Sequence, residues 1–196
     1  MKGMGKYFVG LLPPATLEAQ FKLLKQSFAE QFHVKYALQA PAHLTLKMPF
    51  LYKESKEAEL ATRFTSLLET QEPFFLQLTR IGHFGKRNIH QQVAPSESLM
   101  QLQTTIRSFC KGSLHLVEEL SDRNFQPHLT LAYKDLKPVK FEEVLAFARN
   151  NAVRGEFLVE KAYLMKKVDN RWQLIAPLIF GPDSENLKQG EKEEST

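Results

Sequence analysis

The sequence predicts a mixed fold of helices and strands built from two similar halves. The tetrapeptide His-Leu-Thr-Leu occurs twice, at 43–46 and 128–131, and each copy lies in an apolar run shortly after a proline. Around the copies, segments of alternating apolar residues are interspersed with segments whose apolar residues recur every three or four positions. The first pattern is typical of strands and the second of amphipathic helices, so each half supplies strands, helices and one tetrapeptide strand.

The first half begins with a strand. The run from Lys6 to Leu12 is rich in Tyr, Phe and Val and stops at Pro13-Pro14, because proline cannot donate to a sheet. Apolar residues at helical spacing then predict a helix over 15–32. By the same reasoning, the remaining elements of this half are a strand over 43–51, a helix over 53–70, a strand over 74–81 and a return strand over 88–93.

The second half repeats this plan. A helix over 95–110 is followed by a loop that contains Asp122, and Pro127 introduces the second tetrapeptide strand. A short helix is expected over 141–150, and the chain continues into two long strands over 157–168 and 171–179. Asp169-Asn170 between these two strands has the composition of a hairpin turn.

Length and charge indicate one domain with an acidic tail. The chain has 196 residues and a formal net charge of +4, and one domain over 1–181 accommodates this length. Residues 182–196 hold five acids and two bases, which leaves a net charge of +7 for 1–181 and −3 for a tail expected to be flexible. The basic excess favours a polyanionic partner such as RNA, although a solvated lysine-rich surface has the same composition.

Cysteine content and hydropathy indicate a cytoplasmic protein. A lone cysteine, Cys110, forms no internal disulfide and fits a reducing compartment. The apolar stretch near the N-terminus is too short for an export signal, and no stretch reaches membrane-spanning length. We therefore expect a monomer in the cytoplasm with no membrane partner.

The paired tetrapeptides are the strongest candidates for chemistry. Side chains alternate along a strand, so each copy presents its His and Thr on one face and buries two leucines on the other. One such motif alone is common in ordinary strands, but two copies in matching halves are hard to explain by packing. If the strands lie side by side, two imidazoles and two hydroxyls share a cleft. Imidazoles exchange protons near neutral pH and hydroxyls hold anionic oxygens, which suffices for phosphodiester hydrolysis without a metal.

This arrangement resembles the 2H phosphoesterase superfamily, which is defined by paired His-x-Thr motifs. Within it, the chain is most similar to the RNA 2′,3′-cyclic phosphodiesterases, also called 2′-5′ RNA ligases, over the segments 7–12, 43–50, 81–93 and 125–131. The resemblance implies an α+β fold of two pseudo-symmetric lobes, with antiparallel sheets facing a central cleft and helices outside. It also implies metal-independent phosphodiesterase activity and a role in RNA processing.

The resemblance assigns roles to four residues. His128 would take a proton from water as it attacks the phosphorus of a 2′,3′-cyclic phosphate, and His43 would protonate the departing 3′ oxygen, leaving a 2′-phosphate. Thr45 and Thr130 would donate hydrogen bonds to the non-bridging oxygens. The same pair could run the reverse, ligating reaction. The residues alone do not decide which histidine is the acid.

Four further residues are candidate substrate contacts. Strand alternation predicts Lys47 on the face of His43, where the RNA enzymes often carry a basic residue, although a strand-end lysine could equally reach solvent. Tyr133 stands where related proteins place an arginine; it could stack on a base but supplies no permanent charge. The loop 82–87 resembles a glycine-and-phenylalanine loop of the family, in which Phe84 could stack on a base or plug the core and Arg87 could contact phosphate.

Other chemistries find little support. The remaining histidines, at positions 33, 83, 90 and 115, are expected to be ordinary surface or hydrogen-bonded residues, and the sequence offers no zinc ligand cluster and no nucleotide-binding glycine loop. We expect no metal and no cofactor. Two alternatives to the cyclic phosphodiesterase stay open: a nucleotide- or RNA-binding module with little turnover, and a 2H enzyme for another phosphoester.

Overall fold

The computed structural model describes residues 3–181, so the predicted acidic tail lies outside the described residues. Eight strands form one antiparallel sheet in the order β6-β3-β4-β5-β2-β1-β7-β8. The strands are β1 (Met4–Leu11), β2 (Leu44–Lys53), β3 (Phe74–Phe84), β4 (Asn88–Val93), β5 (His128–Tyr133), β6 (Gly155–Val159), β7 (Lys161–Val168) and β8 (Arg171–Ile179). The helices are α1 (Ala15–Phe32), α2 (Glu57–Leu68), α3 (Glu97–Gly112), α4 (Leu120–Arg123) and α5 (Phe141–Asn150).

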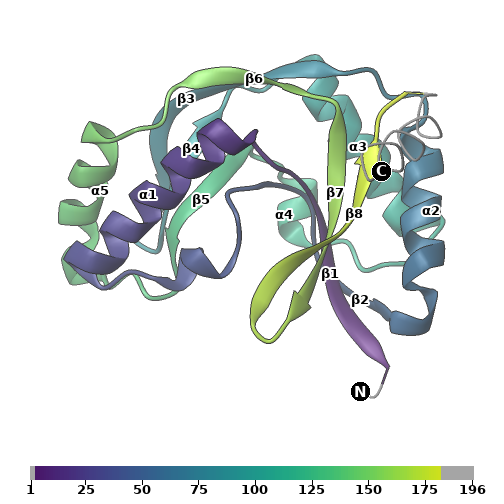
Figure 1. Cartoon of the computed structure of the whole chain (residues 1–196), viewed down its shortest axis with the longest axis horizontal. Coiled ribbons are helices and arrows are strands. Elements are labelled where there is room, and N and C mark those ends of the chain that lie inside the picture. The colour runs from purple at the N-terminus through teal and green to yellow at the C-terminus, as the bar shows by residue number, and fades with distance from the viewer. Residues whose placement is uncertain (1–2, 182–196) are drawn as a thin grey trace, which may run out of the picture.

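The sheet consists of two four-stranded halves that meet at its centre. One half is β2-β1-β7-β8 and the other is β5-β4-β3-β6, so each begins with a tetrapeptide strand. Only one residue pair, Leu44 with Leu129, joins β2 to β5, and the sheet curls open around this junction (Figure 1). The predicted α+β fold of two related antiparallel halves is confirmed, but each half of the sheet takes strands from both halves of the sequence.

Helices cover the outer face of each half. In Figure 1, α1 and α5 lie together over β3, β4 and β5, whereas α2 and α3 lie on the opposite side of the molecule. Although α1 follows β1, it contacts β5; likewise α3 follows β4 but contacts β2. Each of these helices therefore crosses to the other half, which ties the two halves together. None of the helices within residues 3–181 is long and apolar enough to cross a membrane.

The core lies between the sheet and these helices. All four leucines of the two tetrapeptides belong to it, each 1% exposed: Leu44, Leu46, Leu129 and Leu131. This burial agrees with the alternation predicted within each tetrapeptide. Because the leucines are held by the helices behind the sheet, the neighbouring His and Thr side chains are directed to the opposite, concave face.

Most predicted elements are confirmed, and three differ. The predicted loop over 82–87 is shorter, because β3 continues through Phe84 and the turn begins at Gly85. The predicted strand over 157–168 is two strands, because the chain leaves one half after Val159 and enters the other at Lys161; the apolar pattern continues through this crossing. The predicted loop around Asp122 contains the short helix α4. The expected hairpin turn is present, with positive φ at Asp169 (46°) and Asn170 (64°), as its tight two-residue form requires.

Candidate functional site

The two tetrapeptides meet at the centre of the sheet. Since Leu44 pairs with Leu129 in antiparallel register, His43 lies across from Thr130 and Thr45 across from His128. All four side chains are partly buried. The strand pairing thus brings the four residues that the tetrapeptides predict onto one face of the sheet.

The two histidines are held in the same way. The Nδ1 atom of His43 is 2.8 Å from the Pro41 carbonyl oxygen, and that of His128 is 2.6 Å from the Gln126 carbonyl oxygen. A carbonyl can only accept a hydrogen bond, so Nδ1 carries the hydrogen in both rings. Each Nε2 is then left with its lone pair and can take up or return a proton on the concave face.

Helix α1 fixes the loop that holds His43. The Lys25 ammonium donates a hydrogen bond of 3.1 Å to the Ala40 carbonyl, and the Glu18 carboxylate accepts one of 2.8 Å from the Ala42 amide. Between these contacts lies Pro41, whose carbonyl orients His43. Burial lowers the pKa of Lys25 to about 8, against the opposing charge of Glu18.

Aromatic rings form the walls around both imidazoles. The Phe8 ring centroid is 4.6 Å from that of His43, and Trp172 meets Phe8 edge-on at 4.7 Å. On the other side, the Phe84 ring meets His128 edge-on at 5.0 Å. These rings exclude water from the imidazoles, which disfavours their charged forms.

Burial depresses the pKa of both histidines. It lowers the pKa of His43 to about 4; the Pro41 hydrogen bond opposes this shift, while the positive charges of Lys25 and His128 add to it. Burial also lowers the pKa of His128, opposed by the hydrogen bond to Gln126. The His43 imidazole is therefore neutral at pH 7 in the unliganded protein, and burial favours the neutral form of His128 as well.

A third histidine, which sequence reasoning treated as ordinary, lies in the same site. His90 pairs with Thr130 across β4 and β5, is 2% exposed, and its ring centroid is 4.7 Å from that of His128. Its Nδ1 is 2.8 Å from the Asn88 side-chain oxygen, and burial together with the nearby charges of His128 and His83 lowers its pKa to about 4.

Gly82 leaves the space that His90 occupies. A Cβ at this position would lie 2.7 Å from His90 Nε2 and 2.6 Å from Gln92 Nε2, which is closer than any side chain tolerates. The sequence gives one signal for this arrangement, a strand glycine where backbone approaches a neighbouring group. It does not identify His90 as that group, because the pairing of β4 with β5 is not evident from local pattern.

The fourth residue of each tetrapeptide is a β-bulge. In β2, Thr45 pairs with Gly10 and Lys47 with Val9, so Leu46 is the extra residue. In β5, Thr130 pairs with His90 and Ala132 with Ile89, so Leu131 is the extra residue. A bulge shifts the alternation by one. The prediction that side chains keep alternating between the two faces of the sheet after each tetrapeptide is therefore wrong.

Lys47 is accordingly absent from the cleft, contrary to the sequence-based expectation. Lys47 pairs with Val9, a core residue, so its side chain lies on the face of the sheet that is covered by helices. Its ammonium is 2.6 Å from the Asp122 carboxylate and 3.1 Å from the Val117 carbonyl oxygen, and its side chain is 2% exposed. Neither the phosphate contact nor a reach toward solvent is possible from this position.

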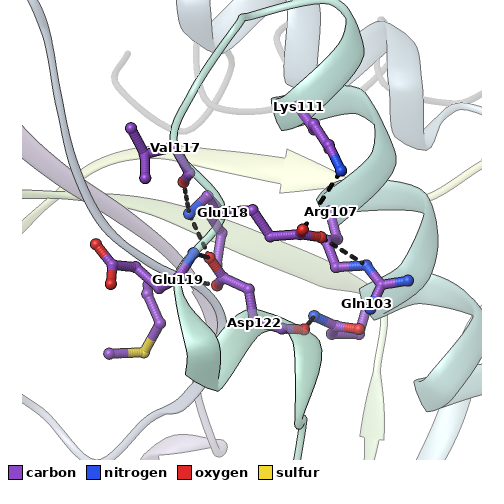
Figure 2. A network of polar contacts seen from close by, with 9 residues as sticks. Gln103, Arg107, Lys111, Val117, Glu118, Glu119 and Asp122 are labelled. Carbon is purple, nitrogen blue, oxygen red and sulfur yellow. Dashed lines mark hydrogen bonds and ion pairs between the residues drawn. The ribbon is translucent and has the colours of Figure 1, made fainter.

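The residues around Lys47 form a closed polar network under α4. The Asp122 carboxylate also accepts hydrogen bonds from the amides of Met48 and Glu119, and Gln103 of α3 donates to the Asp122 carbonyl (Figure 2). With each polar atom of the ion pair satisfied in this way, the pair holds α3 and α4 against β2.

The bulge in β5 keeps Tyr133 on the concave face. Tyr133 pairs with Asn88, whose side chain contacts His90, and it is 43% exposed. Its ring meets that of Tyr36 edge-on at 6.2 Å, and the Lys134 ammonium lies 4.5 Å from the Tyr36 ring centroid. An aromatic surface with a nearby cation therefore stands where the resemblance expects an arginine.

Phe84, the last residue of β3, lies at the site, and Arg87, in the turn that follows, lies at its periphery. Phe84 is 40% exposed and lies outside the core, so it is a wall of the cleft rather than a core plug. Arg87 is exposed in the turn after Gly85, and within residues 3–181 it forms no ion pair. Among the same residues, no three His, Cys, Asp or Glu side chains are grouped to hold a metal ion.

Comparison with solved structures places the fold. E. coli LigT complexed with 3′-AMP superposes with a TM-score of 0.65 at 18% identity, covering 90% of this chain and 98% of LigT. TT0787 of Thermus thermophilus gives a TM-score of 0.61 at 15% identity, covering 89% and 97% of the two chains. At these identities the likeness shows a shared fold.

Sequence relatives and a family model identify the family. A candidate phosphoesterase of Bacillus licheniformis is 27% identical over 179 residues, which cover 90% of this chain and 99% of the relative. One of Bacillus pumilus is 25% identical over 181 residues, with 91% and 99% covered. The model of the 2'-5' RNA ligase superfamily matches residues 13–171. The resemblance drawn from the paired tetrapeptides is thus confirmed, and the chain belongs to the 2'-5' RNA ligase superfamily of 2H phosphoesterases.

Proposed function

We propose that this protein hydrolyses 2′,3′-cyclic phosphate ends of RNA or nucleotides to 2′-phosphates. The observation that carries the proposal is the pair of imidazoles on one face, each with Nδ1 bound to a backbone carbonyl and Nε2 left free. General acid and base catalysis of a displacement at phosphorus requires two proton-transfer groups that can reach opposite sides of one phosphate.

In the proposed reaction, neutral His128 accepts a proton from a water molecule through Nε2 as the water oxygen bonds to phosphorus. The bond between phosphorus and the 3′ oxygen breaks, and protonated His43 delivers its Nε2 proton to that oxygen. Thr45 and Thr130 donate hydrogen bonds to the non-bridging oxygens, where negative charge is held as the geometry at phosphorus changes. One water is consumed, and the 2′-phosphate remains attached to the ribose.

Ligand chemistry of the related structures supports this substrate class. Solved structures of E. coli LigT contain 3′-AMP in one case and phosphate in another. The first is a nucleotide with a phosphate on its ribose, and the second matches the phosphate group alone. On our proposal, Phe84 and Tyr133 contact the base or sugar of such an end, and Arg87 approaches its flanking backbone; Lys47 has no part in substrate binding.

The test is turnover of a nucleoside 2′,3′-cyclic phosphate in the presence of EDTA, followed by chromatography of the product. We expect a 2′-phosphate product, and we expect His43→Ala and His128→Ala each to lower kcat on the order of a hundredfold or more, because a positioned acid or base contributes about 10²–10⁴-fold. His33→Ala serves as a control, since His33 is an exposed residue at the C-terminal end of α1. A requirement for added metal, or full activity in both variants, would refute the mechanism.

A second candidate function is binding without turnover. It is favoured by the position of Lys47, which is buried under α4, and by Tyr133, which stands where the resemblance implies an arginine. Tight binding of a nucleoside 2′-phosphate with no product formed over long incubation of the cyclic substrate would support this function over hydrolysis.

A further inference from the structure

A basic hollow adjoins the concave face on the side of β3. It has a volume of about 460 Å³, and its lining includes Arg80, Arg149, Arg154, His83, Gly82 and Gln92. No aspartate or glutamate lines it. Three arginines that line one hollow without an acid form a site suited to phosphate, because arginine donates several hydrogen bonds in a fixed plane.

A bulge in β3 turns Arg80 toward this hollow. Leu78 pairs with Val93 and Ile81 with Gln91, so β3 has one residue more than β4 in this interval. Strict alternation after the buried Leu76 and Leu78 would bury position 80, yet Arg80 is exposed. Bulges are frequent beside functional sites, where they redirect a side chain.

Gln92 links the hollow to the catalytic strand. Arg80 Nε donates a hydrogen bond of 2.9 Å to Gln92 Oε1, and Gln92 pairs with His128 across β4 and β5. The contact fixes one edge of the Arg80 guanidinium and leaves its two terminal nitrogens for a ligand. Two strand spacings separate β3 from β5, which is about 10 Å, so the hollow lies one or two nucleotides from the proposed reaction.

The other two arginines come from a different part of the chain. Arg149 is in the last turn of α5, and Arg154 lies just before β6; both are exposed. Within residues 3–181, none of the three arginines forms an ion pair with a carboxylate. These arginine side chains therefore have no carboxylate partner among the described residues, and a bound anion would supply one.

We propose that this arginine hollow binds the backbone phosphate that precedes the cyclic end of an RNA strand. The proposal rests on the proposed function and narrows its substrate class: an oligoribonucleotide, which carries such a phosphate, is preferred over a nucleoside 2′,3′-cyclic phosphate, which does not. The hollow supplies binding energy away from the reacting phosphorus and takes no part in proton transfer.

The test compares two substrates in two variants. The substrates are a pentaribonucleotide with a 2′,3′-cyclic end and a nucleoside 2′,3′-cyclic phosphate; the variants are the triple substitution Arg80→Ala, Arg149→Ala, Arg154→Ala and the control Arg63→Ala. Arg63 is in α2, which contacts β8 at the far end of the sheet. We expect the triple variant to lose about tenfold to a hundredfold in kcat/KM on the pentanucleotide, with less than a twofold change on the nucleoside substrate.

Salt dependence gives an independent readout. For each phosphate contact removed, the slope of log kcat/KM against log salt concentration for the pentanucleotide should become shallower by about 0.7, and the Arg63 variant should keep the wild-type slope. Equal losses on both substrates, or an unchanged slope, would overturn the proposal.

If the wild-type protein turns over neither substrate, the proposed function fails. A binding measurement with an oligoribonucleotide then tests whether the hollow is a phosphate site. A fluorescently labelled pentaribonucleotide with a 2′-phosphate end is then titrated with each protein and followed by anisotropy. Weaker binding by the triple variant alone supports the hollow as a phosphate site, whereas equal affinity of wild type and triple variant overturns it.

Discussion

Removal of the Asp122 carboxylate is expected to destabilise the protein strongly. The side chains of Lys47 and Asp122 are 2% and 1% exposed and their charged atoms are 2.6 Å apart. In Asp122→Ala, the ammonium of Lys47 stays buried with only the Val117 carbonyl, and the amides of Met48 and Glu119 lose their acceptor. Breaking a buried ion pair from one side costs about 3–5 kcal/mol, a large fraction of the roughly 5–15 kcal/mol that stabilises a domain.

Urea unfolding followed by circular dichroism measures this cost. The matched variants are Lys47→Met, which leaves the Asp122 carboxylate buried alone, and the double substitution with Asp122→Leu, which replaces the pair by apolar groups. We expect each single change to be destabilising and the double change to cost less than their sum, because neither charge is then left unpaired. Lys47→Met should leave KM within a factor of about two.

Two results would refute this reasoning. A loss below about 1 kcal/mol in Asp122→Ala would show that the Lys47 ammonium finds water or another partner. An increase in KM in Lys47→Met at unchanged stability would show that Lys47 contacts the substrate. It would then support the face that strict strand alternation predicts for this residue.

Three further predictions concern the histidines of the concave face. Because the pKa of His43 is lowered to about 4 and that of His128 is also lowered, kcat/KM on a cyclic nucleotide should peak below pH 6.5; a maximum above pH 7.5 would contradict this. The folded protein favours the neutral forms of His43 and His90, so their contribution to stability is complete above pH about 6.5 and is lost as pH falls toward about 4. The urea concentration at the unfolding midpoint should decline over this pH window, and it should decline less steeply in His43→Gln. Gly82→Ala should displace His90, cost about 1–3 kcal/mol and lower activity, and wild-type behaviour would show that the ring can move freely.

The sequence predicts the elements and the centre of the site well because both depend on local signals. Apolar spacing locates the helices over 15–32 and 141–150, and these bounds are the observed ones. The repeated tetrapeptide identifies the two strands that meet, and alternation within four residues correctly separates His and Thr from the buried leucines. These features require no knowledge of which strands pair elsewhere.

What the sequence did not predict depends on pairing between distant strands. The bulges at Leu46 and Leu131 invert the alternation after each tetrapeptide, and nothing in the local pattern marks them. Lys47 was therefore placed on the wrong face, and His90 and Arg80 were not recognised as neighbours of the site. In each case, the position of a side chain follows from its cross-strand partner and not from its place in its own strand.

The strands around the two tetrapeptides pair in the same way but differ at one position. This difference bears on the proposed roles of His43 as acid and His128 as base. Gly10 beside Thr45 corresponds to His90 beside Thr130. A Cβ at Gly10 would lie 2.8 Å from the Leu44 carbonyl oxygen and 3.0 Å from the Phe8 ring. The glycine therefore leaves room for the neighbouring strand and for the Phe8 ring beside His43, whereas His128 faces the polar imidazole of His90. On the proposed mechanism, a donor with a pKa of about 4 is almost entirely deprotonated in the free protein at pH 7. An anionic phosphate bound beside His43 favours the protonated form of its imidazole. On the proposed mechanism, substrate binding would therefore bring about protonation of His43 Nε2, and the free protein would have no proton at that atom to give to the leaving oxygen.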